Sequence, residues 1–143
     1  GKLLAQAVAT ACEGEPLDVV LPVPMHWRRR LSRGYDHAGV LAHAVAGELG
    51  LPVSDDLLRI RHTPPQINLS RTGRLENVRR AFGLRGGDAL AGANVLLIDD
   101  VTTTGATANE AARTLLRGHA NRVVLGVVAK AEPPTAYAQH WAT

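Results

Sequence analysis

The sequence predicts one α/β domain with a mostly parallel sheet flanked by helices. Short runs of Val, Leu and Ile, typical of buried strands, alternate with longer segments whose apolar residues recur at helical spacing. The connections between these segments are short, which favours consecutive strands within one sheet. A chain of 143 residues is long enough for one domain with a core of ordinary size, so we expect a single domain over residues 1–143.

The first half of the chain predicts two helices and one confident strand. Residues 2–13 form a helix by their apolar spacing, and residues 18–24 (DVVLPVP) form a short strand that prolines terminate. Residues 35–50 form the next helix, which Gly50 and Pro52 stop.

The second half continues the alternation of strands and helices. A strand is expected over 57–61, a proline-rich loop over 62–74, and a short helix over 74–82 that leads into a strand at 82–84. The remaining expected elements are a strand over 94–100, a helix over 105–120 and a last strand over 122–131.

Composition and charge exclude several kinds of protein. The only cysteine, Cys12, rules out an internal disulfide and a multi-cysteine zinc site, and no apolar run approaches the length of a membrane span. We expect a cytoplasmic protein without a membrane span. Between Arg28 and Arg85 the chain carries 11 arginines and five acidic residues, so this part should attract anions. Charge alone does not choose between phosphorylated small molecules and nucleic acid.

The segment VLLIDDVTTTGATANEAARTLL, Val95 to Leu116, indicates a sugar-phosphate site. A buried strand ends on Asp99 and Asp100, and ligands of parallel sheets bind beyond the carboxyl ends of strands. A small, hydroxyl-rich turn follows and leads into a helix, whose N-terminal amides suit a phosphate. The acids would bind the neutral hydroxyls of a sugar rather than the phosphate itself. Acids and threonines also occur as plain turn and N-cap residues, but the complete pattern is more specific.

The same segment resembles the phosphoribosyl-diphosphate-binding motif of type I phosphoribosyltransferases, the fold of amidophosphoribosyltransferase. The segments DVVLPVPMHWRRRLSRGYDHAGVLAHAVAGELGLPV, LLRIRHTPPQINLSRTGRLENVRRAFGL and LAGANVLLIDDVTTTGATANEAARTLL resemble, in that order, parts of the ComF/GntX family. That family is linked to DNA uptake in competent bacteria.

The resemblance implies roles for individual residues. Asp99 and Asp100 would bind the ribose hydroxyls. The residues expected to bind the 5-phosphate are Thr103, Thr104, Gly105, Ala106 and Thr107. The loop expected to bind pyrophosphate contains Pro24, Met25, His26, Arg28, Arg29 and Arg30. A flexible loop over the reacting centre would contribute Gln66, Arg71 and Arg74.

The implied activity is displacement of pyrophosphate from 5-phosphoribosyl diphosphate, a pentosyl transfer, with Mg²⁺ bound through the pyrophosphate and no direct protein ligand to the metal. No segment of this sequence is long enough for the hood that covers such sites, so we expect the hood to be absent or minimal, or to lie in an N-terminal part that this sequence does not include. Thr103 is similar in position to an acid of hypoxanthine-type enzymes. A non-catalytic module that senses the phosphoribosyl ligand therefore remains an alternative. A competence factor that binds single-stranded DNA or a competence helicase is another, although the arginine-rich part contains few aromatic residues for base stacking.

Overall fold

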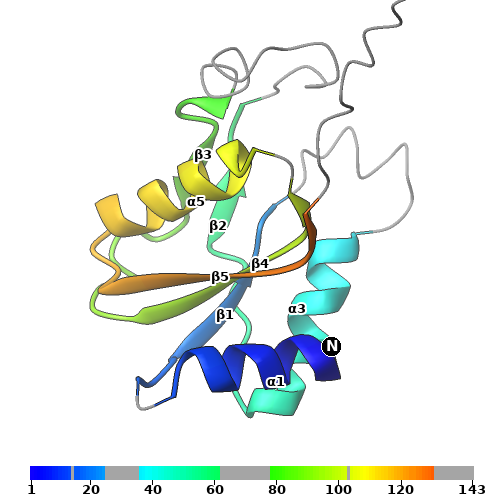
Figure 1. Ribbon diagram of the computed structural model, residues 1–143. Coiled ribbons are helices and arrows are strands. Elements are labelled where there is room, and N and C mark those ends of the chain that lie inside the picture. The colour runs from blue at the N-terminus through cyan, green and yellow to red at the C-terminus, as the bar shows by residue number, and fades with distance from the viewer. Residues whose placement is uncertain (14, 25–35, 62–77, 103, 131–143) are drawn as a thin grey trace, which may run out of the picture.

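A three-stranded parallel sheet organises the domain. In the computed structural model the described residues are 1–13, 15–24, 36–61, 78–102 and 104–130. The strands follow the order β1-β4-β5, with bounds β1 (Val19–Pro22), β4 (Asn94–Thr102) and β5 (Arg122–Lys130). Figure 1 shows β4 between the two others. The register pairs Leu21 with Leu97 and Leu97 with Leu125, so all three strands end at the same edge.

Helices cover both faces of this sheet. On one face lie α1 (Lys2–Ala11) and α3 (His37–Leu49), and on the other lies α5 (Ala106–Arg117) (Figure 1). A two-stranded antiparallel ribbon, β2 (Leu57–Arg59) with β3 (Phe82–Leu84), shares the face of α5.

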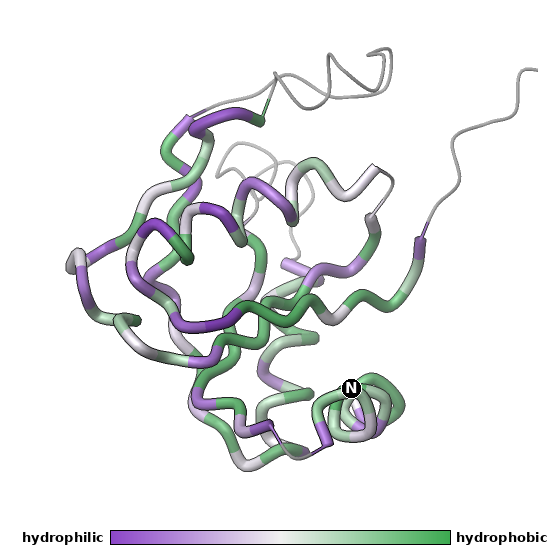
Figure 2. The backbone as a smooth tube through the Cα atoms, turned by 60° about the vertical axis from the view of Figure 1, so that its left-hand side comes forward, coloured by the Kyte–Doolittle hydropathy of each residue, from purple (hydrophilic) through white to green (hydrophobic). Residues whose placement is uncertain are grey.

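Alternating side chains of β4 divide the core into two layers. Val95 and Leu97 pack with α5 and the ribbon, whereas Leu96 and Ile98 pack with α1 and α3. All four are fully buried, and Figure 2 shows the hydrophobic residues concentrated in these central strands. A strand that is apolar on both faces is what a parallel sheet between helices requires.

The structure confirms the predicted α/β class and the parallel sheet, while several element ends differ. The first helix stops at Ala11, two residues before its expected end, where the Cys12 amide donates to the Val8 carbonyl at 2.9 Å and the Glu13 amide donates to the Thr10 carbonyl at 3.4 Å. The strands expected at 57–61 and 82–84 pair antiparallel to each other and form a separate ribbon. The helix expected over 74–82 lies mostly outside the described residues.

The helix α3 ends where its sequence predicts but begins at His37, two residues after the expected start at residue 35. The Asp36 carboxylate accepts a hydrogen bond from the Gly39 amide at 3.0 Å, which satisfies one of the amides that a helix start leaves unpaired. Gly50 follows the last residue with φ of +67°, a left-handed conformation that glycine adopts without a Cβ penalty. Among the described residues, no helix is long and apolar enough to cross a membrane.

The central position of β4 makes a stability prediction. Leu97→Ala should lower the free energy of unfolding by about 2–5 kcal/mol, because it opens a cavity in a fully buried layer. Leu125→Ala is the matched control, since that side chain is 43% exposed on the edge strand, and it should cost less than about 1 kcal/mol. Urea denaturation of both variants measures the difference, and equal losses would refute the assignment of β4 as the buried centre.

Candidate functional site

Two acidic residues lie where β4 approaches the carboxyl edge of the sheet. Asp99 is buried, with 9% of its surface exposed, and Asp100 is half-buried. Asp99 Oδ1 accepts a hydrogen bond from the Asp100 amide at 3.0 Å, and Asp100 Oδ1 accepts one from the Val101 amide at 2.9 Å. Each carboxylate therefore accepts a hydrogen bond from the amide of the residue that follows it in β4.

The expected strand end at Asp100 is corrected by two residues. β4 continues to Thr102 because β5 pairs with it that far, with Val101 opposite Ala129 and Thr102 opposite Lys130. The acids thus occupy the last part of a paired strand rather than a free end. The pairing holds their backbone in place, so the carboxylates are positioned before any ligand arrives.

The environment of Asp99 disfavours its charged form. The pKa of Asp99 is raised from 3.8 to about 6. Burial is the largest cause, and the neighbouring negative charge and side-chain hydrogen bond of Asp100 also raise this pKa. The Asp100 amide and the positive charge of Arg59 partly oppose it. Above about pH 6 the Asp99 carboxyl is mostly ionised and can accept hydrogen bonds from the hydroxyls of a diol.

The turn after β4 leads directly into the N-terminus of α5. Gly105 precedes the helix with φ of +73°, and its carbonyl accepts the first helical hydrogen bond, from the Asn109 amide at 2.8 Å. Thr104 Oγ1 accepts a longer bond, of 3.4 Å, from the Ala106 amide, and Thr107 lies in the first helical turn. The positive end of the helix dipole therefore lies a few residues beyond the two carboxylates, as an anion site requires.

The start of the expected pyrophosphate loop lies beside these acids. The Val23 amide donates to the Ile98 carbonyl at 2.7 Å, which continues the parallel register past the last residue of β1. Pro24 therefore leaves the sheet next to the acidic end of β4. The other residues of the expected site, Thr103, Met25, His26, Arg28, Arg29, Arg30, Gln66, Arg71 and Arg74, lie outside the described residues.

Two basic residues near this edge were not singled out from the sequence. Arg59, in the ribbon strand β2, is close enough to Asp99 for its charge to lower the pKa of that carboxyl. Lys130 is the β5 residue paired with Thr102. Forty residues separate Arg59 from Asp99, and only the fold brings them together, so no local pattern could have indicated either residue.

The side chains at this edge suit a metal ion that takes most of its oxygen ligands from the bound small molecule. No group of three or more His, Cys, Asp or Glu side chains that could hold a metal ion occurs among the described residues. Mg²⁺ prefers oxygen ligands and keeps phosphate oxygens and waters in its shell. The adjacent carboxylates of Asp99 and Asp100 fit such an ion as one or two additional oxygen donors.

Gly105 has a conformation that a side chain would strain. Gly105→Ala should cost about 1–2 kcal/mol, because an L-residue at φ of +73° brings its Cβ close to the backbone. Gly47→Ala is the control, since Gly47 lies inside α3 with open space around it and should gain about 0.5–1 kcal/mol of stability. Thermal denaturation measures both, and a stabilising Gly105→Ala would contradict the left-handed turn.

The raised pKa of Asp99 predicts that its charge destabilises the fold. Asp99→Asn should increase the free energy of unfolding by up to about 3 kcal/mol at pH 7. This value follows from the increase in the pKa of Asp99 from 3.8 to about 6. Because the folded state binds the proton more tightly, the cost of Asp99 develops as pH rises from about 4 to 6. The gain should therefore vanish near pH 4. Denaturation of both proteins across this range tests the prediction, and a gain independent of pH would contradict it.

Comparisons with known proteins identify the family of this chain and its fold. The phosphoribosyl transferase domain family matches residues 36–141. "DNA utilization protein YhgH" of Salmonella typhi is 36% identical over 126 residues, which cover 85% of this chain and 55% of that protein. "Competence protein F" of Haemophilus influenzae is 34% identical over 100 residues, covering 68% of this chain and 44% of that protein. The chain thus spans about half the length of these relatives.

Solved structures show the same fold. A glutamine phosphoribosylpyrophosphate amidotransferase from B. subtilis, in complex with ADP and GMP, is similar with a TM-score of 0.57 and 24% identity over 88% of this chain and 24% of that one. A crystal structure of adenine phosphoribosyltransferase gives a TM-score of 0.60 and 17% identity over 91% of this chain and 68% of that one. The parallel sheet, the acidic end of β4 and the matched residues lead to one conclusion: the chain belongs to the phosphoribosyl transferase domain family, has the type I fold, and is related to the ComF-type competence and DNA utilization proteins.

Proposed function

We propose that this domain binds 5-phosphoribosyl diphosphate or a related sugar phosphate at the carboxyl edge of β4. One observation carries the proposal: two adjacent carboxylates near the end of β4, Asp99 and Asp100, are followed within a few residues by the N-terminus of α5. This arrangement offers acceptors for a vicinal diol next to donors for a phosphate. A ribose 5-phosphate has both groups at opposite ends of a small ring.

Each part of the ligand would have its own binding residues. Asp99 and Asp100 would accept hydrogen bonds from the ribose hydroxyls, and the turn Thr103–Thr107 would donate to the 5-phosphate. The pyrophosphate would lie toward the loop that begins at Pro24 and includes Arg28, Arg29 and Arg30. Gln66, Arg71 and Arg74 would come from the flexible loop. Arginine side chains match phosphate oxygens geometrically and keep their charge at all relevant pH values.

Mg²⁺ would arrive with the pyrophosphate and offset the charge of that leaving group. In a transfer reaction the bond between C1 of the ribose and a pyrophosphate oxygen breaks while an acceptor nucleophile bonds to C1. This chain's residues would orient the sugar and hold the departing anion. Because Thr103 replaces the acid that takes a proton in hypoxanthine-type enzymes, the acceptor must lose its proton to another group or need no base. A phosphoribosyltransferase is therefore our first assignment, and sensing of the ligand without turnover is its alternative.

A role in DNA uptake is the second part of the proposal, because relatives are named for competence and DNA utilization. Single-stranded DNA or a competence helicase would then be the macromolecular partner, and the arginines between Arg28 and Arg85 supply a positive surface for the former. We assign the domain to the cytoplasm, which suits a phosphoribosyl ligand and a chain with one cysteine.

Isothermal titration calorimetry with 5-phosphoribosyl diphosphate, with and without Mg²⁺, tests the proposed site. The wild-type protein should bind the ligand, and Mg²⁺ should strengthen the binding. The double variant Asp99→Asn with Asp100→Asn should lose at least about 100-fold in affinity, because amide side chains replace two charged acceptors at about 1.4 kcal/mol or more each.

Asp55 and Asp56 provide the matched control, since they are the chain's other pair of adjacent aspartates and precede β2. Asp55→Asn with Asp56→Asn removes the same charge away from β4 and should leave the affinity unchanged. Absence of binding by the wild-type protein, or equal losses in the two double variants, would refute the site.

A further inference from the structure

A positively charged groove runs along α5 on the side away from β5. It is a cavity of about 390 Å³ between the helix and the residues that precede β3. Four arginines line it, together with one glutamate: Arg79, Arg80, Arg113, Arg117 and Glu110. We call this cavity the arginine groove.

Glu110 neutralises only part of this charge. Its carboxylate is buried, accepts a hydrogen bond from Arg117 at 2.9 Å, and accepts another from the Arg80 amide at 3.0 Å. Burial alone would raise its pKa, but these hydrogen bonds and the charges of Arg117 and Arg113 outweigh it and lower the pKa, so Glu110 is ionised. Among the described residues that line the groove, the four arginines and one glutamate give an excess of three positive charges. An anionic occupant is the one that this groove favours.

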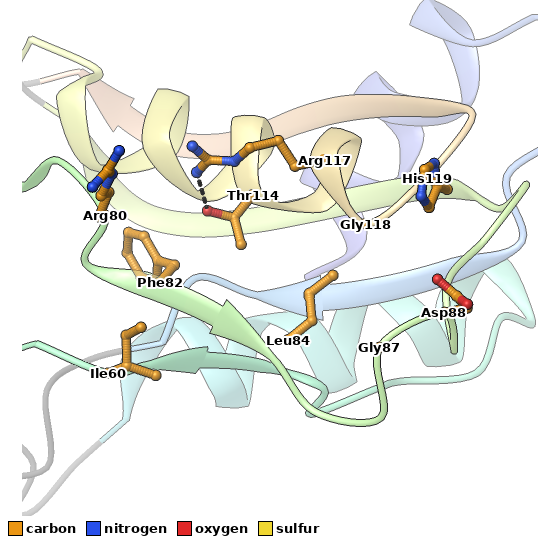
Figure 3. Close-up of a pocket in the computed structure, with 10 residues that line it drawn as sticks. All are labelled: Ile60, Arg80, Phe82, Leu84, Gly87, Asp88, Thr114, Arg117, Gly118 and His119. Carbon is orange, nitrogen blue, oxygen red and sulfur yellow. Dashed lines mark hydrogen bonds between the residues drawn. The ribbon is translucent and has the colours of Figure 1, made fainter.

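An apolar hollow continues the groove. Figure 3 shows it between the ribbon and the C-terminal half of α5, with Ile60, Phe82 and Leu84 below and Thr114 and Arg117 above. Its volume is about 410 Å³, and it shares Arg80 and Arg117 with the arginine groove. The two cavities therefore form one surface that is positively charged along the groove and mainly apolar in the hollow, where Asp88 and His119 lie at the end away from Arg80.

The shape of the hollow argues against a small molecule. Ile60 is 62% exposed although it lines the hollow, so the cavity is shallow and open. Small-molecule sites instead enclose most of the ligand surface. A shallow surface of this kind fits an extended chain that lies across it.

The aromatic residue of the hollow is poorly suited to nucleobases. Phe82 is only 4% exposed, and the guanidinium of Arg59 lies 5.4 Å from the centre of its ring. Single-stranded nucleic acid binds by stacking its bases on accessible aromatic faces, which the described part of this surface does not offer. Aliphatic side chains such as those of Ile60 and Leu84 suit an apolar side chain of a peptide.

We propose that the arginine groove and the adjoining hollow dock an extended acidic segment of a partner protein. Carboxylates of the segment pair with Arg79, Arg80 and Arg113, and an aliphatic side chain a few residues away lies in the hollow beside Ile60 and Leu84. The charged end provides attraction and specificity, and the apolar end slows dissociation. The groove adjoins the proposed sugar-phosphate site, because Ala106 of the proposed phosphate turn also lines it, whereas the hollow lies farther along α5.

Fluorescence anisotropy with synthetic peptides tests the docking surface. The probes are fluorescein-labelled peptides in which a Leu-Leu pair follows a run of alternating Glu and Asp at varied spacing. At least one spacing should bind the wild-type protein saturably. The double variant Arg79→Glu with Arg113→Glu should weaken that binding by at least about tenfold, because two attractive charges become repulsive.

Three controls distinguish the effect of charge, the effect of the apolar hollow and the effect of misfolding. Arg85→Glu changes an exposed arginine outside both cavities and should have little effect on binding. Ile60→Ser should weaken the peptide about fivefold without any change of charge, and it should be tolerated because the side chain is mostly exposed. Thermal denaturation and 5-phosphoribosyl diphosphate titration of each variant verify that the fold and the sugar-phosphate site are intact.

Several outcomes would overturn the proposal. One is failure of every peptide to bind the wild-type protein, and another is equal weakening by Arg85→Glu and by the double variant. Labelled oligo(dT) is tested in parallel. If it binds through Arg79 and Arg113 while the peptides do not, the surface belongs to nucleic acid rather than to a protein partner.

Discussion

The pairing of β4 between β1 and β5 is the constraint on which the rest of this domain depends. Its residues from Val95 to Ile98 are buried on both faces, so the strand cannot shift by one residue without exchanging its two core layers. That fixed register carries Asp99 and Asp100 to the carboxyl edge. The core therefore positions the two aspartates, whereas the buried charge of Asp99 does not stabilise the core.

The environment of Asp99 shows how stability and binding oppose each other here. A carboxyl group that is buried next to another carboxyl is held in its charged form at a cost in folding free energy. A diol that donates hydrogen bonds to both groups would relieve this cost, so the ligand and not the fold would benefit from the pair. The proposed phosphate site at the start of α5 would be separated from the acids by a turn, in which Gly105 lets the backbone enter α5.

Local patterns in the sequence predict much of this structure, and long-range placement lies beyond them. The continuous apolar run before Asp99 predicts a buried parallel strand, and Gly50 predicts the end of α3. The extension of β4 to Thr102 depends on its pairing with β5, and no residue between 100 and 102 indicates it. Local patterns also do not predict that Arg59 lies near Asp99, or that Arg79 lies beside Arg113 of α5. These residues are far apart in the chain and meet only in the fold.

A crystal structure of the protein soaked with ribose 5-phosphate would test the central claim most directly. We predict density for the sugar with its two ring hydroxyls against Asp99 and Asp100, and with its phosphate at the amides that begin α5. Density for the ligand elsewhere, or an unchanged β4 edge under conditions where calorimetry detects binding, would contradict the assignment of this edge as the sugar-phosphate site.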